Sequence, residues 1–352
     1  MTTPATFPAD VTVSIVAHNA RNYLGACLDS VAAIGCPTTQ IVVVDVASTD
    51  GLADWLRGEW PGVEVVRLDR NDGPSPGRNA GIRHRPTKYV LLLDADVQLE
   101  PRVLTLLYDA ITRDPRIAIG SPVVVKAEQP ETIQYADTSL HFICEAVNPY
   151  LDRPLAERGG DARDIGVAST CALLLDRQVA IDIGLFDERY FIGKEDGDFT
   201  HRARLAGYRI LELPDARVRH LTKGRSDWLF YYQIRNRWHF LLKNYEVATL
   251  VVILPALVVH EAMQLVFLLT KGYGLTYLKA LGGLLAMLPD LPRDRALTRR
   301  IRRLHDRDVL VSGRIVVRQD LAGRGPVGAL MRLYEGFLDL YWRIVRRALP
   351  RS

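Results

Sequence analysis

Apolar and polar positions follow two different periods in the first half of the chain. Short runs rich in apolar residues predict strands, at Val11–Ala17, Ile41–Val46, Glu64–Asp69 and Tyr89–Leu93. Segments with apolar residues three or four positions apart lie between them and predict helices, over Ala20–Ala33, Leu52–Gly58 and Pro74–Ile82. Runs that are β-branched or apolar at almost every position are typical of strands covered on both faces. The alternation of strands and helices predicts an α/β fold with a mostly parallel sheet.

Acidic side chains follow two of these predicted strands. Asp45 lies in the second strand, shortly before Ser48–Gly51, and the fourth strand runs into Asp94 and Asp96. Ligands of parallel sheets bind beyond the carboxyl ends of the strands, so we expect the site at these positions. Neither GxGxxG nor GxxxxGK[ST] follows a strand, which excludes the usual dinucleotide fingerprint and the P-loop. A bound nucleotide would need another phosphate clamp, and a divalent cation supplies one.

Asp94 and Asp96 are candidate metal ligands. Two carboxylates at the end of a buried strand can face one cation, and their hard oxygens suit Mg²⁺ or Mn²⁺, which in turn bind phosphate. The alternative is a solvated turn, because such triplets are common. His220 follows the strand-like segment Tyr208–Val218, and a lone histidine is more often structural than a ligand. The other seven histidines have no ligand spacing.

A second acidic cluster, Lys194–Asp198, precedes a predicted helix over Phe199–Ala206 that ends at Gly207. Glu195 and Asp196 either cap this helix, because its dipole favours carboxylates at the N-terminus, or include a general base. Spacing alone leaves both interpretations open.

Seven segments, in order, resemble the family-2 glycosyltransferases of the GT-A fold. That family's inverting, non-processive members transfer sugars from nucleotide-sugar donors, and the resemblance is to the rhamnosyl- and N-acetylglucosaminyltransferase-like, membrane-associated kind. It extends from about Val11 to Tyr245. The segments are VSIVAHNARNYLGACLDSV, IVVVDVASTDG, RNDGPSPGRNAGI, YVLLLDADV, GLFDERYFIGKEDGDFTHRARLAGYRI, VRHLTKGRS and YYQIRNRWHFLLKN.

The resemblance implies a role for each matching residue. It implies nucleotide contacts for Ala17 and Asn19, a uracil or thymine contact for Asp45, and a base and ribose contact for Asp50. Arg78 and Asn79 would lie at the phosphate and donor-sugar edge. Asp94 would contact the ribose or the metal, and Asp96 and His220 would ligate the metal directly. Asp196 would be the catalytic base, with Glu195 as a supporting or acceptor-side group.

Several positions depart from the family pattern. Val46 stands where a polar residue is common, and Ser169–Cys171 replaces a small Gly-Ala pair. The segment Gln233–Trp238 has one residue too many for the QxxRW motif of processive synthases. Arg235 and Arg237 in it could bind a diphosphate or be ordinary surface charge. The stretch Leu151–Ile165 is expected to be either a mobile acceptor-side loop or a plain surface loop.

Charge divides the chain into two parts. Residues 1–245 hold 28 Lys and Arg against 32 Asp and Glu, whereas residues 246–352 hold 17 against 9. We therefore expect a transferase domain over 1–245 and a helical membrane-association region over 246–352, the latter attracted to anionic headgroups. The four cysteines form no CxxC pair and residues 1–13 show no secretory pattern, so we expect a reducing, cytosolic compartment.

The segment Val247–Leu269 is long enough to span a bilayer. Pro255 and the pair His260–Glu261 argue against a simple span, because charge is costly at mid-membrane, and both flanks are basic. A hairpin or re-entrant segment over about 247–289, with Leu275–Leu288 as its second limb, satisfies both flanks. The region 291–349 carries basic and amphipathic helices. We expect peripheral or monotopic attachment at the cytoplasmic face, with packing on the core or on a second subunit as the alternative.

The expected partners follow from these assignments. The donor would be a UDP-, dTDP- or GDP-sugar, the cofactor Mg²⁺ or Mn²⁺, and the acceptor a polyprenyl-linked glycan or glycolipid. Membrane lipids are expected and nucleic acid is not, while a homodimer is left open. Two other functions compete. A nucleotidyltransferase would need a glycine-rich loop after the first strand, and a non-catalytic membrane scaffold would not need its carboxylates.

Overall fold

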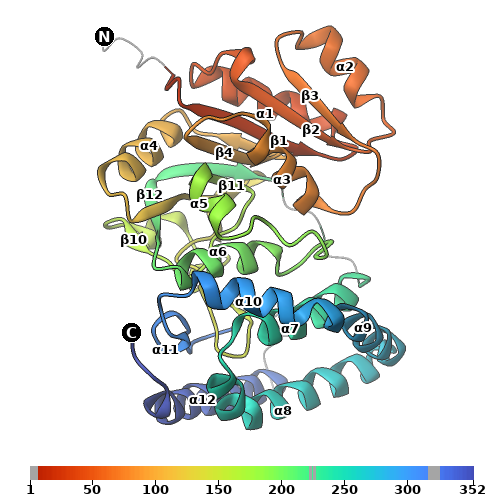
Figure 1. The fold of residues 1–352 in the computed structure, drawn as a ribbon, viewed down its shortest axis with the longest axis vertical. Helices are drawn as coiled ribbons and strands as arrows, with labels where there is room; N and C mark the ends of the chain where they lie inside the picture. The colour runs from red at the N-terminus through yellow and green to blue at the C-terminus, as the bar shows by residue number, and fades with distance from the viewer. Residues whose placement is uncertain (1–6, 222–223, 225–226, 316–325) are drawn as a thin grey trace.

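The first half of the chain folds into one twisted sheet with helices on both faces (Figure 1). This computed structural model describes residues 7–221, 224, 227–315 and 326–352. Within them the main sheet has the order β10-β12-β6-β11-β4-β1-β2-β3, with β5 beside β12 and β7 beside β6. The central strands β1, β2, β4 and β11 pack into the core. The predicted α/β fold is confirmed.

The predicted strands and helices of this half occur within a few residues of their expected bounds. The strands of the main sheet are β1 (Val11–Ala17), β2 (Ile41–Val46), β3 (Glu64–Leu68), β4 (Tyr89–Asp94), β5 (Val97–Leu99), β6 (Ile117–Lys126), β7 (Gln129–Tyr135), β10 (Arg163–Asp164), β11 (Ala172–Asp176) and β12 (Arg209–His220). A small hairpin joins β8 (Ser139–Leu140) to β9 (Ala146–Val147). The helices are α1 (Arg21–Ala33), α2 (Leu52–Glu59), α3 (Pro74–His84), α4 (Val103–Arg113), α5 (Arg177–Asp182) and α6 (Glu195–Leu205).

The sheet register aligns the strand ends that carry the acidic residues. β1 runs parallel to both β2 and β4, with Ala17 opposite Asp45 and Val16 opposite Asp94. Strand β12 returns antiparallel to β5, which places His220 opposite Val97. A histidine more than 120 positions away along the chain therefore lies beside the turn that carries Asp96. The topology, not local spacing, brings these groups together.

Helix α3 lies very close to the sheet because two of its residues have no side chain. A Cβ at Gly81 would overlap the hydroxyl of Ser14, and a Cβ at Gly77 would meet Val16 at 2.6 Å. Ser14 and Val16 belong to β1, so the two glycines let the helix pack directly on that strand. Arg78 follows Gly77 and is thereby positioned at the end of the sheet.

The second half of the chain is helical and lies on one side of the sheet (Figure 1). Its helices are α7 (Leu229–Asn244), α8 (Val247–Thr270), α9 (Gly274–Met287), α10 (Leu291–Ile301), α11 (Asp306–Val309) and α12 (Pro326–Val345). The β8–β9 hairpin of the first half packs into this region, where Phe142 stacks on Trp342 with ring centroids 4.9 Å apart. The two halves thus share a hydrophobic cluster that includes Phe142, Leu241, Leu257 and Leu338.

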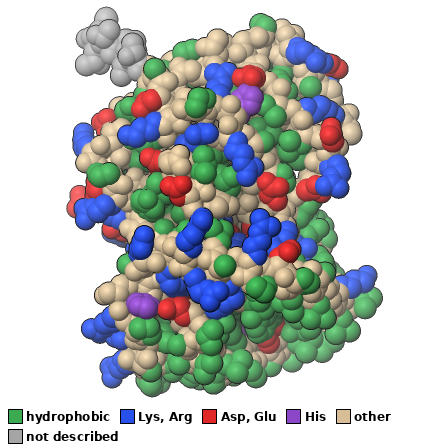
Figure 2. Space-filling view, in the orientation of Figure 1, with side chains coloured by type: hydrophobic (Ala, Val, Ile, Leu, Met, Phe, Trp, Pro, Cys, Tyr) green, Lys and Arg blue, Asp and Glu red, His purple; other side chains and the backbone are tan. Residues whose placement is uncertain are grey.

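Helices α8, α9 and α12 leave an apolar face exposed. Figure 2 shows hydrophobic side chains gathered at the lower end of the molecule, over these helices. We call this surface the apolar face; its large exposed residues are Val247, Val251, Leu254, Val258, Val259, Val266, Leu269, Leu275, Leu278, Leu285, Leu330, Leu333, Phe337, Leu340 and Ile344. Among the described residues, one helix, α8, is long enough and apolar enough to cross a membrane.

The ionisable residues of α8, His260 and Glu261, turn inward and not toward this face. His260 Nδ1 lies 2.7 Å from the hydroxyl of Tyr334 in α12, and Tyr277 in α9 donates a hydrogen bond to Glu261 Oε2 at 2.7 Å. Glu261 also pairs with Arg237 of α7. The helix therefore has a polar side packed on protein and an apolar side that is exposed, which is the pattern of a helix lying in an interface.

The stretch 151–165, expected to be a mobile or a plain surface loop, is fastened to the sheet. Arg158 is buried and pairs with Glu212 of β12 at 2.9 Å, and Arg163–Asp164 form β10 on the same strand. This anchoring favours the plain surface loop.

Candidate active site

Three predicted metal ligands meet at the end of the sheet. One ligand atom from each of Asp94, Asp96 and His220 lies within 4.8 Å of the others. His220 Nε2 is 3.4 Å from Asp96 Oδ1, and its Nδ1 is 3.0 Å from Gln134 Oε1. When Nδ1 donates to that amide oxygen, the lone pair of Nε2 faces the carboxylates, and a cation between them relieves the repulsion. The donor set therefore fits Mg²⁺ or Mn²⁺.

A buried arginine joins this group to the second acidic cluster. Arg78 Nη2 donates to both oxygens of Asp94, at 2.9 and 3.2 Å, and its Nη1 lies 3.4 Å from Asp196 Oδ1 and 3.9 Å from Glu195 Oε1. Burial raises the pKa of Asp94, and the positive charge of Arg78 opposes that effect. Arg78 thus bridges the two clusters, which are far apart in the sequence.

The two candidate catalytic carboxylates have different surroundings. The Asp196 side chain is one-third exposed and accepts hydrogen bonds from the hydroxyl of Thr170 at 2.5 Å and from its backbone N–H at 3.2 Å. Glu195 is buried, and its Oε2 has no hydrogen-bond partner among the described residues. Burial, aided by the negative charge of Asp196, raises the pKa of Glu195 to about 8. Only Asp196 is open to an acceptor.

The predicted nucleotide-binding residues cluster at the ends of β1 and β2. Asn19, at a positive φ of 49°, donates through its backbone N–H to Ser48 Oγ at 2.9 Å. Asp50 accepts from the backbone N–H of Arg21 at 2.9 Å, while Ala17 is buried at the end of β1. These contacts join the two strand ends into one rim. The nucleotide contacts themselves stay a prediction.

Asp45 and Asn79 are more enclosed than the sequence suggests. Asp45 is fully buried, accepts from Ser48 N at 2.8 Å and pairs with Arg67 of β3. Asn79 exchanges two hydrogen bonds with the backbone of Phe186, both at 2.9 Å. Both side chains therefore brace the protein, and their predicted donor contacts stay predictions.

Sequence reasoning did not single out Glu145, which helps to hold the loop 183–194 before α6; we call this segment the catalytic loop because Glu195 and Asp196 follow it. Lys194, at a positive φ of 72°, precedes α6 and donates to Glu145 at 2.7 Å. Glu145 in turn lies 3.6 Å from Arg237 and 3.8 Å from His260. Arg237, left open as a diphosphate ligand, is fully buried in this network. Glu145 and Lys194 could not be paired from sequence because 49 residues separate them.

Arg235, the other residue considered as a diphosphate ligand, also contacts protein groups. Its Nη2 donates to the carbonyl of Arg189 at 2.7 Å, and its guanidinium lies over the rings of Tyr231 and Tyr232.

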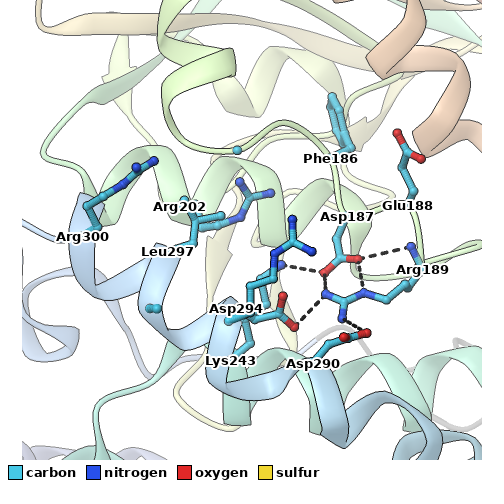
Figure 3. Close-up of a pocket in the computed structure, with 13 residues that line it drawn as sticks. Phe186, Asp187, Glu188, Arg189, Arg202, Lys243, Asp290, Asp294, Leu297 and Arg300 are labelled. Carbon is cyan, nitrogen blue, oxygen red and sulfur yellow. Dashed lines mark hydrogen bonds and ion pairs between the residues drawn. The ribbon is translucent and has the colours of Figure 1, made fainter.

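A separate cavity of about 740 Å³ lies between α10 and the loop 184–189 (Figure 3). None of the predicted site residues lines it. Asp187, His239 and Asp294 offer ligand atoms within 4.8 Å of one another there. Arg189 and Lys243 already pair with these carboxylates, as the dashed lines in Figure 3 show, so this cluster is a salt-bridge network.

Comparison with known proteins identifies the family. The pattern described as Glycosyl transferase family 2 matches residues 12–183. An undecaprenyl-phosphate mannosyltransferase of Micrococcus luteus is 30% identical over 184 residues, which cover 51% of this chain and 71% of that protein. The chain belongs to glycosyl transferase family 2.

Two further relatives match over shorter shares of their length. An N-acetylglucosaminyl-diphospho-decaprenol L-rhamnosyltransferase of Mycobacterium tuberculosis is 27% identical over 204 residues, 51% of this chain and 66% of that protein. The succinoglycan biosynthesis protein ExoO of Rhizobium meliloti is 29% identical over 133 residues, 37% of this chain and 38% of that protein. The chain spans less than two thirds of either relative.

Solved structures share the GT-A-like fold. S. aureus TarS 1–349 superposes with a TM-score of 0.52 at 19% identity, over 96% of this chain and 90% of that one. GalNAc-T7, solved with UDP, GalNAc and Mn²⁺, gives a TM-score of 0.55 at 19% identity, over 67% of this chain and 48% of that one.

Proposed function

We propose that this chain is a metal-dependent, inverting glycosyltransferase that moves a sugar from a nucleoside diphosphate donor to a hydroxyl of a lipid-linked or cell-surface glycan acceptor. The observation that carries the proposal is the grouping of Asp94, Asp96 and His220, together with the buried Arg78 that joins Asp94 to Asp196. A pocket that holds a diphosphate and a proton acceptor at one strand edge is what such a transfer needs.

Asp96 and His220 would hold the cation, with Asp94 completing the set. A bound Mg²⁺ or Mn²⁺ supplies neutralisation of the charge that develops on the departing diphosphate. Arg78 keeps Asp94 and Asp196 in fixed positions, because its guanidinium contacts both. The rim formed by Asn19 and Asp50 would face the nucleoside. The Mn²⁺ and UDP in the GalNAc-T7 structure support this assignment.

Asp196 is the proposed base. As the acceptor oxygen forms its bond to the anomeric carbon, Asp196 takes the hydroxyl proton, and the bond from that carbon to the diphosphate oxygen breaks. A single displacement from the opposite face inverts the configuration. Thr170 orients the carboxylate through its hydroxyl and backbone N–H. Glu195, sealed beneath it, supports the site without contacting the acceptor.

We propose attachment to the cytoplasmic face of the membrane, peripheral or monotopic, through the apolar face of α8, α9 and α12. The inward-turned His260 and Glu261 support in-plane attachment over a span. The relatives named for undecaprenyl-phosphate and diphospho-decaprenol support a polyprenyl-linked acceptor. The transferase region would cover residues 1–245 and the attachment region 246–352, with β8–β9 packed between them.

A thermal-shift panel of UDP-, dTDP- and GDP-sugars with and without Mn²⁺ tests the donor and metal sites. We expect one donor to raise the melting temperature of the wild type only with Mn²⁺, and Asp96→Asn to abolish that shift. Formation of pyrophosphate from a sugar phosphate and a nucleoside triphosphate would instead indicate a nucleotidyltransferase. Absence of any donor shift would favour a non-catalytic scaffold and overturn the proposal.

A further inference from the structure

Three aromatic side chains form a cluster beside the catalytic loop. Tyr232 of α7 stacks on Phe191 with ring centroids 5.2 Å apart. Trp228, at the start of α7, lies edge-on to both, 6.3 Å from Phe191 and 5.8 Å from Tyr232. Trp228 is 50% exposed, so this cluster presents a large apolar side chain at the surface.

This cluster is fixed to the loop that precedes Glu195 and Asp196. Asn236 of α7 donates to the carbonyls of Ile192 and Gly193, at 3.1 and 2.7 Å. On the other side, Gly73 lies so close to the carbonyl of Phe191 that a Cβ would overlap it. Phe191 is therefore held between the start of α3 and α7, a few residues before Glu195 and Asp196.

A second group of aromatic side chains joins α7 to the apolar face. Phe230 contacts Phe267 of α8, with ring centroids 6.1 Å apart, and Tyr273 of the α8–α9 turn, at 5.5 Å. Leu269 and Leu275 flank this turn and are 58% and 65% exposed. Tyr273 also donates a hydrogen bond to Asp227, the residue before Trp228, so the two aromatic groups meet at the start of α7. We call the six residues together the aromatic strip: Phe191, Trp228, Tyr232, Phe230, Tyr273 and Phe267.

We propose that the aromatic strip binds the apolar chain of the lipid-linked acceptor, an inference that rests on the proposed function. The chain leaves the bilayer at the α8–α9 turn, lies over Trp228 and Tyr232, and presents its phosphate-linked headgroup to Asp196. The continuity of the strip with the apolar face favours a lipid chain over a sugar ring, because a platform for a sugar alone would need no connection to that face.

Binding of farnesyl phosphate to the full-length protein tests this assignment, with methyl phosphate as the probe that lacks the chain. We expect Trp228→Ala and Tyr232→Ala each to raise the dissociation constant for farnesyl phosphate about tenfold, because each removes apolar contact area. Tyr232→Phe keeps the ring and serves as the matched control, with a change of less than about twofold expected. A benzophenone-bearing farnesyl phosphate should crosslink to residues of the strip.

Any of three outcomes overturns the proposal. One is equal affinity of wild type and alanine variants for farnesyl phosphate; another is crosslinking confined to the exposed residues of α12. Weak binding of farnesyl phosphate to the wild type, no tighter than methyl phosphate, counts against it equally. The donor thermal shift with Mn²⁺, measured on the same preparations, separates these failures from failure of the proposed function. Melting curves establish that each variant is folded.

Discussion

At the scale of single residues, the carboxylate of Asp196 is held by hydrogen bonds and is still partly exposed to solvent. Thr170 and Arg78 fix its carboxylate, yet one third of the side chain is exposed. Asp196→Asn keeps the shape and removes the base, so we expect kcat to fall by about 10²- to 10⁴-fold with donor affinity retained. Thr170→Val removes only the orienting hydroxyl, and roughly a tenfold loss is expected. Steady-state kinetics with the identified donor measures both; an active Asp196→Asn enzyme would contradict the assignment.

Glu195 should make the free energy of unfolding depend on pH. Its pKa in the folded protein is raised to about 8 by burial, so between about pH 4.5 and pH 8 the folded state binds a proton that the unfolded state has lost. Stability should therefore fall as pH rises across this window and level off above it. Glu195→Gln cannot ionise, and we expect its stability advantage over the wild type to grow from pH 5 to pH 8.

Urea unfolding at several pH values measures this difference. Glu131→Gln, an exposed glutamate on β7, is the matched control and should show no such trend. A constant offset between Glu195→Gln and the wild type would contradict a buried, protonated Glu195.

Sequence predicted the acidic residues of the site but not their partners. Asp94, Asp96 and Asp196 stand out because they follow buried strands or precede a helix. Thr170, Arg67 and Glu145 do not, because their contacts depend on how β11, β3 and the β8–β9 hairpin pack. His220 is intermediate: family resemblance marked it, and only the pairing of β12 with β5 explains its position.

At the scale of elements, the strands with continuous apolar runs were predicted best. β1 and β2 have their expected bounds, since burial on both faces leaves little choice of residue. α6 begins at Glu195 and not at Phe199, because Lys194 takes a left-handed conformation that starts the helix one turn earlier. The region of α4, β6 and β7 gave no prediction. Burial explains β6, but its register on β12 depends on contacts distant in sequence.

Helix α3 offers a direct test of element packing. Gly81→Ala places a Cβ against Ser14 of β1, so we expect a loss of about 1–3 kcal/mol in unfolding free energy. The shift of α3 should also displace Arg78 and lower kcat. Gly58→Ala in α2 is the control, because its Cβ would meet no atom within 4 Å, and a gain of up to about 1 kcal/mol is expected. Equal stability of both variants would contradict close packing of α3 on β1.

At the scale of the whole molecule, the apolar face is the proposed surface for membrane attachment. Val251→Asp with Leu254→Asp puts two charges on exposed positions of α8. We expect binding to phosphatidylglycerol-containing vesicles to fall at least about tenfold, with the melting temperature nearly unchanged. Cosedimentation measures the loss. Glu131→Lys, on the distant β7, is the control. Unchanged vesicle binding, together with a dimer in sedimentation velocity that the double variant disrupts, would assign the face to a second copy.

The stacking of Phe142 on Trp342 has a practical consequence for anyone who wishes to crystallise or engineer the catalytic half alone. A fragment that ends at Tyr245 would lack Trp342, so Phe142 would become exposed. It would also lack Glu261 of α8, the partner of Arg237, beside the Glu145–Lys194 ion pair. The newly exposed apolar surface would promote aggregation, and the catalytic loop would be held by fewer contacts. A variant that is soluble without detergent should therefore keep every helix and replace exposed apolar residues of α8, α9 and α12 with polar ones.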